Sequence, residues 1–369
     1  MTPHLQTIAR QFQPHSDITE ICAWGSGNIN HTFRVCCTDA GCDRFILQRI
    51  NTQVFPNPAG IMQNLQVLCH HLQQKLQTQP LPHWQIPQVL CVLDGENHHI
   101  DAAGDCWRAL SFIDGQTVDV IETEQQAQEV GRGLGTFHQL LSDLDPSQLV
   151  DTLPGFHITP EYLELYDAIA TQTDILQTGT APSPEIDYCQ RMVADRRQEL
   201  AGILETAKAA GKLPLRVMHG DPKVNNIMLD THTGHAIALI DLDTVKPGLI
   251  HYDIGDCLRS ACNPHGEETP DWQQVSFDVE RCSRLLQGYL SAAQIFFTTA
   301  DYDYLYPAIR LLPWELGLRF FTDYLAGNVY FAVQDPEHNL RRALVQFKLL
   351  ESIEQQAPLI QDCIQSCQT

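Results

Sequence analysis

The sequence predicts an α+β protein of two lobes, a strand-rich N-terminal lobe over residues 1–113 and a larger helical lobe over residues 114–369. The first observation is length, because 369 residues are too many for one compact core. The second is a change of pattern at residues 114–117, where alternating apolar runs give way to helical spacing. The third is composition: 43% hydrophobic and 18% charged residues are typical of a globular chain with a large core.

The N-terminal lobe is expected to begin with a short helix and continue as a meander of strands. Turn residues at 25–28 and 41–43 separate its apolar runs. From Ile61 to Leu76, apolar side chains recur every three or four residues, which predicts a helix with one buried face. The expected elements are strands at 21–24, 32–37, 44–50, 88–93 and 107–113 and a helix at 58–77.

The C-terminal lobe is expected to be mainly helical. Apolar side chains fall on one face from Ala127 to Leu141, and a loop rich in proline and glycine follows at 152–160. Short strands and polar loops then interrupt the helical pattern. The expected helices span 124–141, 161–170 and 184–210, the strand passage spans 216–244, and the chain beyond 253 is helical again.

The charge balance bears on possible partners. The chain carries 45 acidic against 23 basic residues, a net charge of −22. An acidic surface repels phosphate backbones, which disfavours nucleic acid as a partner. A small polyanion would therefore have to be held by a divalent metal ion and backbone N–H groups rather than by a broad basic patch. Nothing in the sequence indicates the oligomeric state.

The cysteines and the apolar segments indicate the cellular compartment. Thirteen cysteines occur, and no two have the C-x-x-C spacing of a zinc knuckle. Residues 1–20 lack the apolar segment of a secretory signal, and nowhere do 18 apolar residues run together. The sequence therefore predicts reduced thiols in a cytoplasmic protein without a membrane span.

The segment that carries chemistry is His219-Gly220-Asp221-Pro222-Lys223-Val224-Asn225-Asn226. It leaves an apolar strand at 215–218. Taken singly, a histidine, an aspartate or an asparagine in a turn usually caps local structure. Together they fit phosphoryl transfer, which needs a carboxylate to orient the attacking hydroxyl and accept its proton, and oxygen ligands for Mg²⁺. Asp221 suits the first role, and the amide oxygen of Asn226 suits the second.

A second carboxylate is expected to lie near that of Asp221. An apolar triplet follows Asn226, a turn follows at 230–234, and an apolar strand at 236–240 ends at Asp241. A hairpin of this kind would bring Asp241 back beside Asp221. Carboxylate oxygens are hard ligands of the type that Mg²⁺ prefers, so Asp241 is the second predicted metal ligand.

These segments resemble the catalytic and metal-binding part of the aminoglycoside phosphotransferase/choline kinase-like superfamily, whose members are distant relatives of protein kinases. Gly220 after the histidine, and Ile240-Asp241-Leu242-Asp243 in place of Asp-Phe-Gly, favour the small-molecule branch. Asp253-Ile254-Gly255-Asp256 matches a second acidic motif, in which Asp253 is expected to brace the loop. The resemblance implies a bilobal protein-kinase-like fold, with ATP as co-substrate, Mg²⁺, and His219 supporting Asp221 in catalysis.

Within that superfamily, four segments resemble the N-acetylhexosamine 1-kinases. They span residues 45–51, 153–160, 241–248 and 319–325, from the first lobe almost to the C-terminus. This resemblance implies phosphorylation of the anomeric hydroxyl of N-acetylglucosamine or N-acetylgalactosamine. It also implies Arg319, His157, Thr159 and Asp243 as contacts of the sugar, with a second metal contact as an alternative for Asp243. Arg319 and Asp323 stand four apart on one helix face, so a plain surface salt bridge is the alternative there.

The nucleotide is expected in the N-terminal lobe. Glycines in the turn Gly25-Ser26-Gly27-Asn28 would let backbone N–H groups approach phosphate oxygens. The lysine usual on the third strand is absent, as is its glutamate partner on the next helix. Arg49 is the nearest cation, with Gln48 on the opposite face of the strand. The hinge at 110–113, with Ser111 and Ile113, would present backbone groups to adenine.

Two alternatives to a hexosamine kinase remain open at the level of sequence. The same reaction could act on choline, homoserine or an aminoglycoside. The missing lysine and glutamate would also fit a pseudokinase that binds nucleotide without catalysis, although Asp221, Asn226 and Asp241 are all present.

Overall fold

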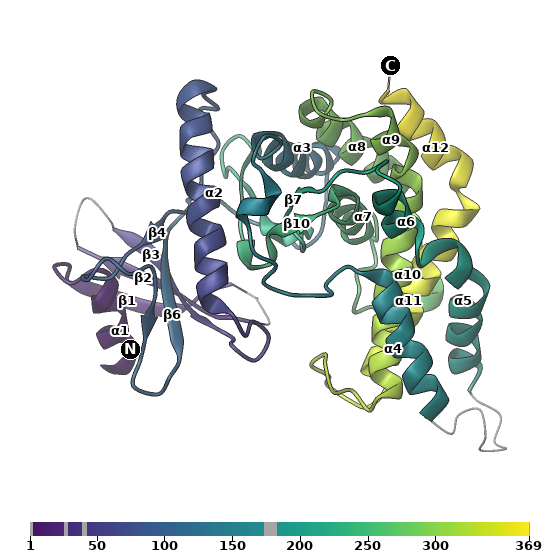
Figure 1. Ribbon diagram of the computed structural model, residues 1–369, viewed down its shortest axis with the longest axis horizontal. Helices are drawn as coiled ribbons and strands as arrows, with labels where there is room; N and C mark the ends of the chain where they lie inside the picture. The colour runs from purple at the N-terminus through teal and green to yellow at the C-terminus, as the bar shows by residue number, and fades with distance from the viewer. Residues whose placement is uncertain (1–2, 26–28, 39–42, 173–182, 369) are drawn as a thin grey trace.

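The computed structural model describes residues 3–25, 29–38, 43–172 and 183–368. A β-sheet lobe and a helical lobe lie side by side, with a long helix standing between them (Figure 1). The predicted α+β class is therefore confirmed. No helix in the described residues is long and apolar enough to cross a membrane. In the same residues, no disulfide joins the cysteines.

The N-terminal lobe is a six-stranded antiparallel sheet in the order β1-β2-β3-β6-β4, with β5 also paired to β6. One face buries Phe45, Leu47 and Trp107 against Ile8 and Phe12 of the first helix, as the alternation of side chains along a strand requires. The bounds are α1 Pro3–Phe12, β1 Ile18–Ala23, β2 His31–Cys37, β3 Arg44–Ile50, α2 Pro58–Thr78, β4 Val89–Leu90, β5 His99–Ile100 and β6 Cys106–Ser111.

Helix α2 ties the two lobes together. Its N-terminus is set by Asn57, whose side chain accepts a hydrogen bond from the Gly60 N–H. Its apolar face belongs to the main core of the C-terminal lobe. Asn64, only 1% exposed, donates to the carbonyl groups of Val150 and Val245. A neutral amide thus fixes this helix to the C-terminal lobe.

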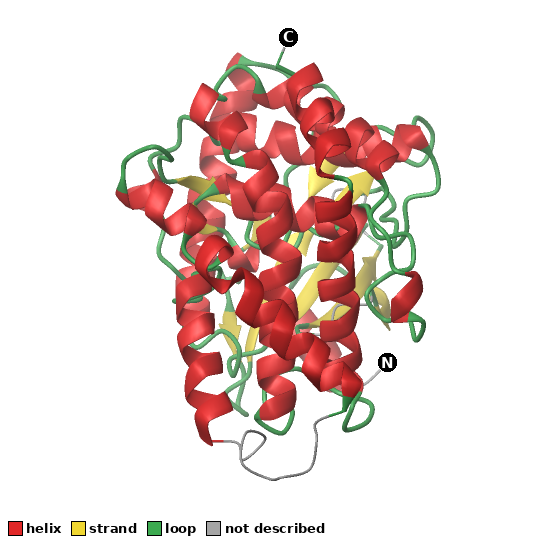
Figure 2. Ribbon diagram, turned by 90° about the vertical axis from the view of Figure 1, so that its right-hand side faces the viewer, coloured by secondary structure: helices red, strands yellow, loops and turns green. Residues whose placement is uncertain are grey.

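The C-terminal lobe is helical around two small two-stranded sheets, and in Figure 2 its helices stand in front of the strands. The helix expected over 184–210 is two helices, because Gly202 begins a new one. The helices are α3 Glu124–Leu140, α4 Thr159–Gln172, α5 Pro184–Leu200, α6 Ile203–Ala209, α7 Ile250–Ala261, α8 Val279–Ala293, α9 Thr299–Asp303, α10 Leu305–Leu325, α11 His338–Gln355 and α12 Ala357–Ser366. The strands are β7 Arg216–Met218 paired with β10 Lys246–Gly248, and β8 Ile227–Leu229 paired with β9 Ala236–Leu239.

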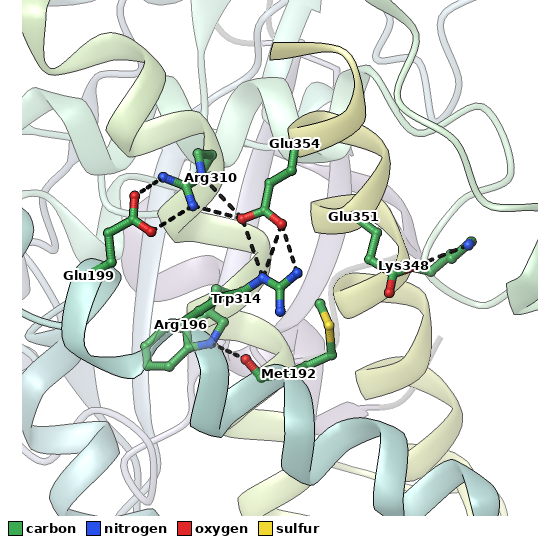
Figure 3. Close-up of polar contacts among 8 residues, drawn as sticks. All are labelled: Met192, Arg196, Glu199, Arg310, Trp314, Lys348, Glu351 and Glu354. Carbon is green, nitrogen blue, oxygen red and sulfur yellow. Dashed lines mark hydrogen bonds and ion pairs between the residues drawn. The ribbon is translucent and has the colours of Figure 1, made fainter.

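An ion-pair network fastens the outer helices to one another (Figure 3). Glu354 on α11 accepts from Arg196 on α5 at 2.8 Å and from Arg310 on α10 at 2.7 Å. Arg310 also pairs with Glu199 on α5. Because one carboxylate serves two guanidinium groups, the network orients three helices at once.

Helices α3 and α8 pack unusually closely, and glycine makes this possible. A Cβ atom at Gly131 would lie 1.9 Å from the carbonyl oxygen of Leu285, and one at Gly288 would lie 1.9 Å from that of Gln128. Any side chain at these positions would force the helices apart. The close contact places His138 of α3 directly under the catalytic loop described below.

We expect Gly131→Ala to destabilise the fold on the order of 2 kcal/mol, because the added methyl group meets backbone that cannot move alone. Thermal unfolding of the variant would measure this as a midpoint lower by several degrees. Gly202→Ala is the matched control, since the nearest atom to its Cβ would be 3.5 Å away. Equal midpoints for the two variants would contradict the close packing.

Candidate active site

The predicted catalytic loop leaves β7 and runs to a short 3₁₀ turn over Val224–Asn226 before β8. Gly220 has φ of +90°, and a Cβ atom there would lie 2.7 Å from the Thr244 carbonyl oxygen. Only glycine satisfies both the left-handed conformation and the close approach. The Thr244 hydroxyl in turn donates to the carbonyl of His219 at 2.8 Å. The loop is therefore fixed against the segment that follows Asp241.

Asp253 on α7 holds the loop from below. Its fully buried carboxylate accepts the backbone N–H of His219 at 2.6 Å and that of Gly220 at 2.8 Å. The same carboxylate lies 2.8 Å from Nε2 of His138, whose Nδ1 contacts the Tyr289 hydroxyl at 2.9 Å. The expectation that Asp253 braces the loop agrees with this geometry.

His219 is buried, and both of its ring nitrogens are engaged. Nε2 lies 2.9 Å from the Ile240 carbonyl oxygen, and Nδ1 accepts the Asp221 N–H at 3.3 Å. Burial, although opposed by the charges of Asp253 and Asp221, lowers the pKa of the ring, so the neutral form is favoured. A neutral ring with no free nitrogen supports the positions of Asp221 and Ile240 and does not act as a base.

Asp221 occupies the position expected of a proton acceptor. Burial raises its pKa to about 6, and the carboxylates of Asp256 and Asp241 add to this while Lys223 opposes it. Its Oδ2 atom lies 2.9 Å from Nζ of Lys223. A carboxylate with a raised pKa is a stronger base than an ordinary aspartate and is still ionised at neutral pH.

Asn226 is brought beside Asp221, as the sequence predicts. Its amide nitrogen donates to the Asp221 carbonyl at 2.7 Å, so the amide oxygen faces the other way. The backbone carbonyl of Asn226 accepts from the Ile240 N–H at 2.9 Å, which ties the loop to the end of β9. The hairpin therefore joins Asn226 to the residue immediately before Asp241.

Asp241 adopts the left-handed conformation, with φ 62° and ψ 53°, which is costly for a residue with a side chain. It is exposed, whereas Leu242 after it is buried. The surrounding protein atoms and the Asp243 carboxylate raise its pKa, against the opposite effect of Lys223 and Arg108. The strained backbone turns this carboxylate away from the hairpin and towards solvent.

Asp243 forms an ion pair with Arg108, a residue that the sequence did not single out. Its Oδ1 atom lies 2.5 Å from Nη1 of Arg108 on β6, and both side chains are almost fully buried. Its Oδ2 atom accepts from the side chain of Asn30 at 2.7 Å. Two N-lobe side chains thus already occupy the predicted sugar contact. A lone arginine within the apolar strand Cys106–Ser111 was the available signal for Arg108.

Arg49 is not brought to this site. It lies on the opposite face of β3 from Gln48, and its Nη1 atom pairs with Asp105 at 2.9 Å. Gln48, by contrast, accepts from Nε of Arg108 at 2.9 Å. The phosphate-directed cation predicted on this strand is therefore corrected: the strand alternation turns Arg49 away, and the cation beside the site comes from β6.

The structure describes only some of the other residues predicted to contact the nucleotide. Gly25 has φ of +75° and open space around it, whereas Ser26, Gly27 and Asn28 lie outside the described residues. At the hinge, the Ser111 N–H and hydroxyl both bond to the backbone of Gln88. The Ile113 side chain packs with Met228 and Ile237 of the C-terminal lobe. Adenine contacts at the hinge stay a prediction.

His157 and Thr159 are turned into the protein and are not free to contact a sugar, which corrects that expectation. His157, with φ of 60°, places Nδ1 2.7 Å from Glu315 and Nε2 3.0 Å from the Gly220 carbonyl oxygen. Thr159 is fully buried and donates to the other oxygen of Glu315. All their polar groups are used inside the protein. They brace the catalytic loop from the α10 side, through the buried carboxylate of Glu315.

Arg319 lies in an aromatic cage beside this brace. Its guanidinium carbon is 5.3 Å from the ring centre of Phe156, 4.8 Å from that of Tyr162 and 5.5 Å from that of Phe331. Within the described part of the chain, no hydrogen bond or ion pair engages this guanidinium. The alternative of a salt bridge with Asp323 is wrong, because that carboxylate accepts three backbone N–H groups at 329–331.

The side chains around the loop fit a magnesium ion that has only a few protein ligands. No group of three histidine, cysteine, aspartate or glutamate side chains in the described residues could enclose a metal. Mg²⁺ is usually held by one or two carboxylates together with phosphate oxygens and waters, which does not require such a cage. Asp241 and the Asn226 amide oxygen supply hard donors of this kind. The buried Oδ1 atom of Asn225 has no hydrogen-bond partner in the described structure and lies on the same turn.

Known proteins resemble this chain in sequence pattern and in fold. A sequence model described as the phosphotransferase enzyme family matches residues 20–295, about three quarters of the chain. The chain is similar to an aminoglycoside phosphotransferase from Alicyclobacillus acidocaldarius, with 16% identity, TM-score 0.61, and 100% and 96% of the two chains covered. A microcompartment-associated aminopropanol kinase has 15% identity, TM-score 0.55, and coverage of 96% and 98%. The GDP complex of aminoglycoside 2'-phosphotransferase-IIIa has 13% identity, TM-score 0.53, and coverage of 98% for both. These likenesses show the fold.

Asp253→Asn should lower turnover at least about 100-fold, because an amide nitrogen facing the loop cannot accept the second backbone N–H. Nucleotide affinity, measured directly by calorimetry, should change much less. Asp278→Asn at the start of α8 is the control, since that carboxylate caps the helix and pairs with Arg281 of the same helix. A variant of Asp253 with normal turnover would contradict its role in positioning the loop.

Proposed function

The chain belongs to the phosphotransferase enzyme family, and from that premise we propose that it transfers the γ-phosphoryl group of ATP to the anomeric hydroxyl of an N-acetylhexosamine. N-acetylglucosamine and N-acetylgalactosamine are the first candidates. The observation that carries the reaction type is the joint placement of Asp221, Asn226 and Asp241 around one loop. Support for a nucleotide co-substrate comes from the similar aminoglycoside phosphotransferase that is solved as a GDP complex.

Each of the three side chains has a distinct part in the proposed reaction. Asp221 orients the acceptor hydroxyl and takes its proton as the new O–P bond forms and the bond to the ADP leaving group breaks. The Asn226 amide oxygen and the Asp241 carboxylate would hold Mg²⁺. When bound, this ion would neutralise charge on the β- and γ-phosphates. His219 keeps Asp221 in place through its ring nitrogen.

The acceptor side favours a neutral or anionic substrate over a cationic one. A cation such as choline needs free aromatic faces. Here the faces of Phe156, Tyr162 and Phe331 already surround the Arg319 guanidinium, whose positive charge would repel a second cation. The unpaired donors of Arg319 suit sugar hydroxyls and an acetamido carbonyl oxygen. This disfavours choline and an aminoglycoside.

Homoserine is the second candidate, because its carboxylate could accept two hydrogen bonds from the Arg319 fork. A non-catalytic role is disfavoured for a different reason. Asp221, Asn226 and Asp241 lie around one loop, and Arg108 supplies a buried cation at the lobe boundary despite the missing lysine. A site that had lost its catalytic function would not be expected to retain Asp241 in a costly left-handed conformation.

The substrate assignment can be tested by following ADP release with Mg·ATP and a panel of acceptors. N-acetylglucosamine or N-acetylgalactosamine should give a sugar 1-phosphate, with homoserine and choline as competing acceptors. Asp221→Asn should abolish turnover while Mg·ATP binding persists, because only the proton acceptor is lost. Turnover of homoserine alone would refute the hexosamine assignment. ATP binding without turnover of any acceptor would favour the pseudokinase reading.

Arg319→Ala should raise the KM of the acceptor about 10–100-fold, the size expected for the loss of a charged hydrogen bond, with the KM of ATP nearly unchanged. Arg342→Ala is the matched control. That arginine also stands over an aromatic ring, at 5.4 Å from Phe320, but it is paired with Glu268. An equal rise for both nucleotide and acceptor would mean that Arg319 acts only through stability.

A further inference from the structure

A buried ion pair joins the two lobes next to the candidate active site. Arg108 comes from β6 of the sheet lobe, Asp243 follows Asp241 in the helical lobe, and their side chains are only 1% and 2% exposed. Burying two charges has a large desolvation cost, so a pair of this kind is weak evidence for stability and invites a functional explanation. Its location at the boundary between the lobes is the place to look for one.

The register of the sheet explains how Arg108 reaches this boundary. Gln48 on β3 is paired directly with Arg108 on β6, so the two side chains emerge on the same face. The Nε atom of Arg108 donates to Gln48 at 2.9 Å. Protein kinases place a phosphate-binding lysine on the third strand. In this chain the third strand offers a neutral glutamine, and the positive charge stands on the adjacent strand.

Asp243 is also linked by hydrogen bonds to other parts of the sheet lobe. Its second oxygen accepts from Nδ2 of Asn30 at 2.7 Å, and Oδ1 of Asn30 accepts the backbone N–H of Asn51 at 3.0 Å. The Asp243 carbonyl also accepts from the Thr152 hydroxyl at 2.9 Å. One residue therefore anchors β6, the start of β2 and the end of β3 to the C-terminal lobe, two positions from Asp241.

We propose that Arg108 is the cation that positions the phosphates of the nucleotide, and that its ion pair with Asp243 replaces the missing lysine–glutamate pair. The pair links the sheet lobe to the segment that follows Asp241, and its guanidinium is a buried positive charge close enough to Asp241 to lower the pKa of that carboxylate. The inference rests on nucleotide-dependent phosphoryl transfer as proposed above, and it is independent of which acceptor is used.

The test is calorimetric binding of Mg·ATP to the full chain, which needs no knowledge of the acceptor. Arg108→Met should weaken binding about 10–100-fold, the loss expected for a charged contact. Arg49→Met is the matched control, because Arg49 lies on the same sheet, faces the other way and pairs with Asp105. Its affinity should stay within about threefold of wild type. The reverse result, with Arg49 needed and Arg108 dispensable, would overturn the proposal.

A second comparison separates positioning from plain stabilisation. Asp243→Asn alone leaves a buried guanidinium without its partner, whereas Asp243→Asn combined with Arg108→Met removes both charges. The double variant should therefore have the higher unfolding midpoint of the two. We expect its Mg·ATP affinity to be about tenfold or more below that of Asp243→Asn. Opposite changes in stability and affinity cannot come from a merely structural pair.

Two outcomes would overturn the assignment in different ways. If the double variant binds Mg·ATP as well as Asp243→Asn does, Arg108 is structural and this inference alone fails. If the wild type binds no Mg·ATP, the proposed phosphoryl transfer fails, and the role of Arg108 fails with it.

Discussion

The buried carboxylate of Asp253 is the constraint on which the rest of the site depends. A charged group that is fully removed from water must be satisfied by hydrogen bonds. Two consecutive N–H groups, of His219 and Gly220, can reach one carboxylate only if the chain turns sharply between them, and the positive φ of Gly220 is that turn. The direction in which Asp221 leaves the loop follows from it. His138 satisfies the carboxylate from the opposite side, which is possible because α3 packs so closely on α8.

The charges around this loop divide into two groups. Asp243 and Asp256 are neutralised within the protein, by Arg108 and Arg259 respectively. In the described part of the chain, Asp221 and Asp241 have no such partner of their own on this loop apart from Lys223, and neighbouring carboxylates raise both pKa values: Asp256 and Asp241 act on Asp221, and Asp243 acts on Asp241. Such crowding of carboxylates costs stability in the free protein. In the proposed reaction a divalent cation and the proton of the acceptor hydroxyl would relieve this repulsion, so that the unfavourable charge of the free site would become favourable interaction with the reactants.

The sequence predicted those parts of the site that depend on neighbours along the chain. The loop from His219 to Asn226 and the hairpin that returns to Asp241 are local patterns, and their residues come together for that reason. Arg108 could not be assigned in the same way, because its position beside Gln48 depends on the pairing of strands sixty positions apart. His157 and Thr159 were misjudged for a similar reason. Their partner, Glu315, lies more than 150 positions away.

Beside Arg319, the hydrogen bonds that Asp323 accepts from backbone N–H groups exclude an ion pair between Asp323 and Arg319. Spacing alone allowed Asp323 to pair with Arg319, but the loop after α10 supplies three backbone N–H groups that take the carboxylate instead. This conformation of the loop brings the Phe331 ring to the guanidinium, which Phe156 and Tyr162 also contact. Contact with aromatic rings orients a guanidinium without using its N–H donors, whereas a carboxylate partner would have consumed them. The protein thereby holds a rigid cation with free donors next to the brace of its catalytic loop, an arrangement that loses little entropy when a polar ligand binds.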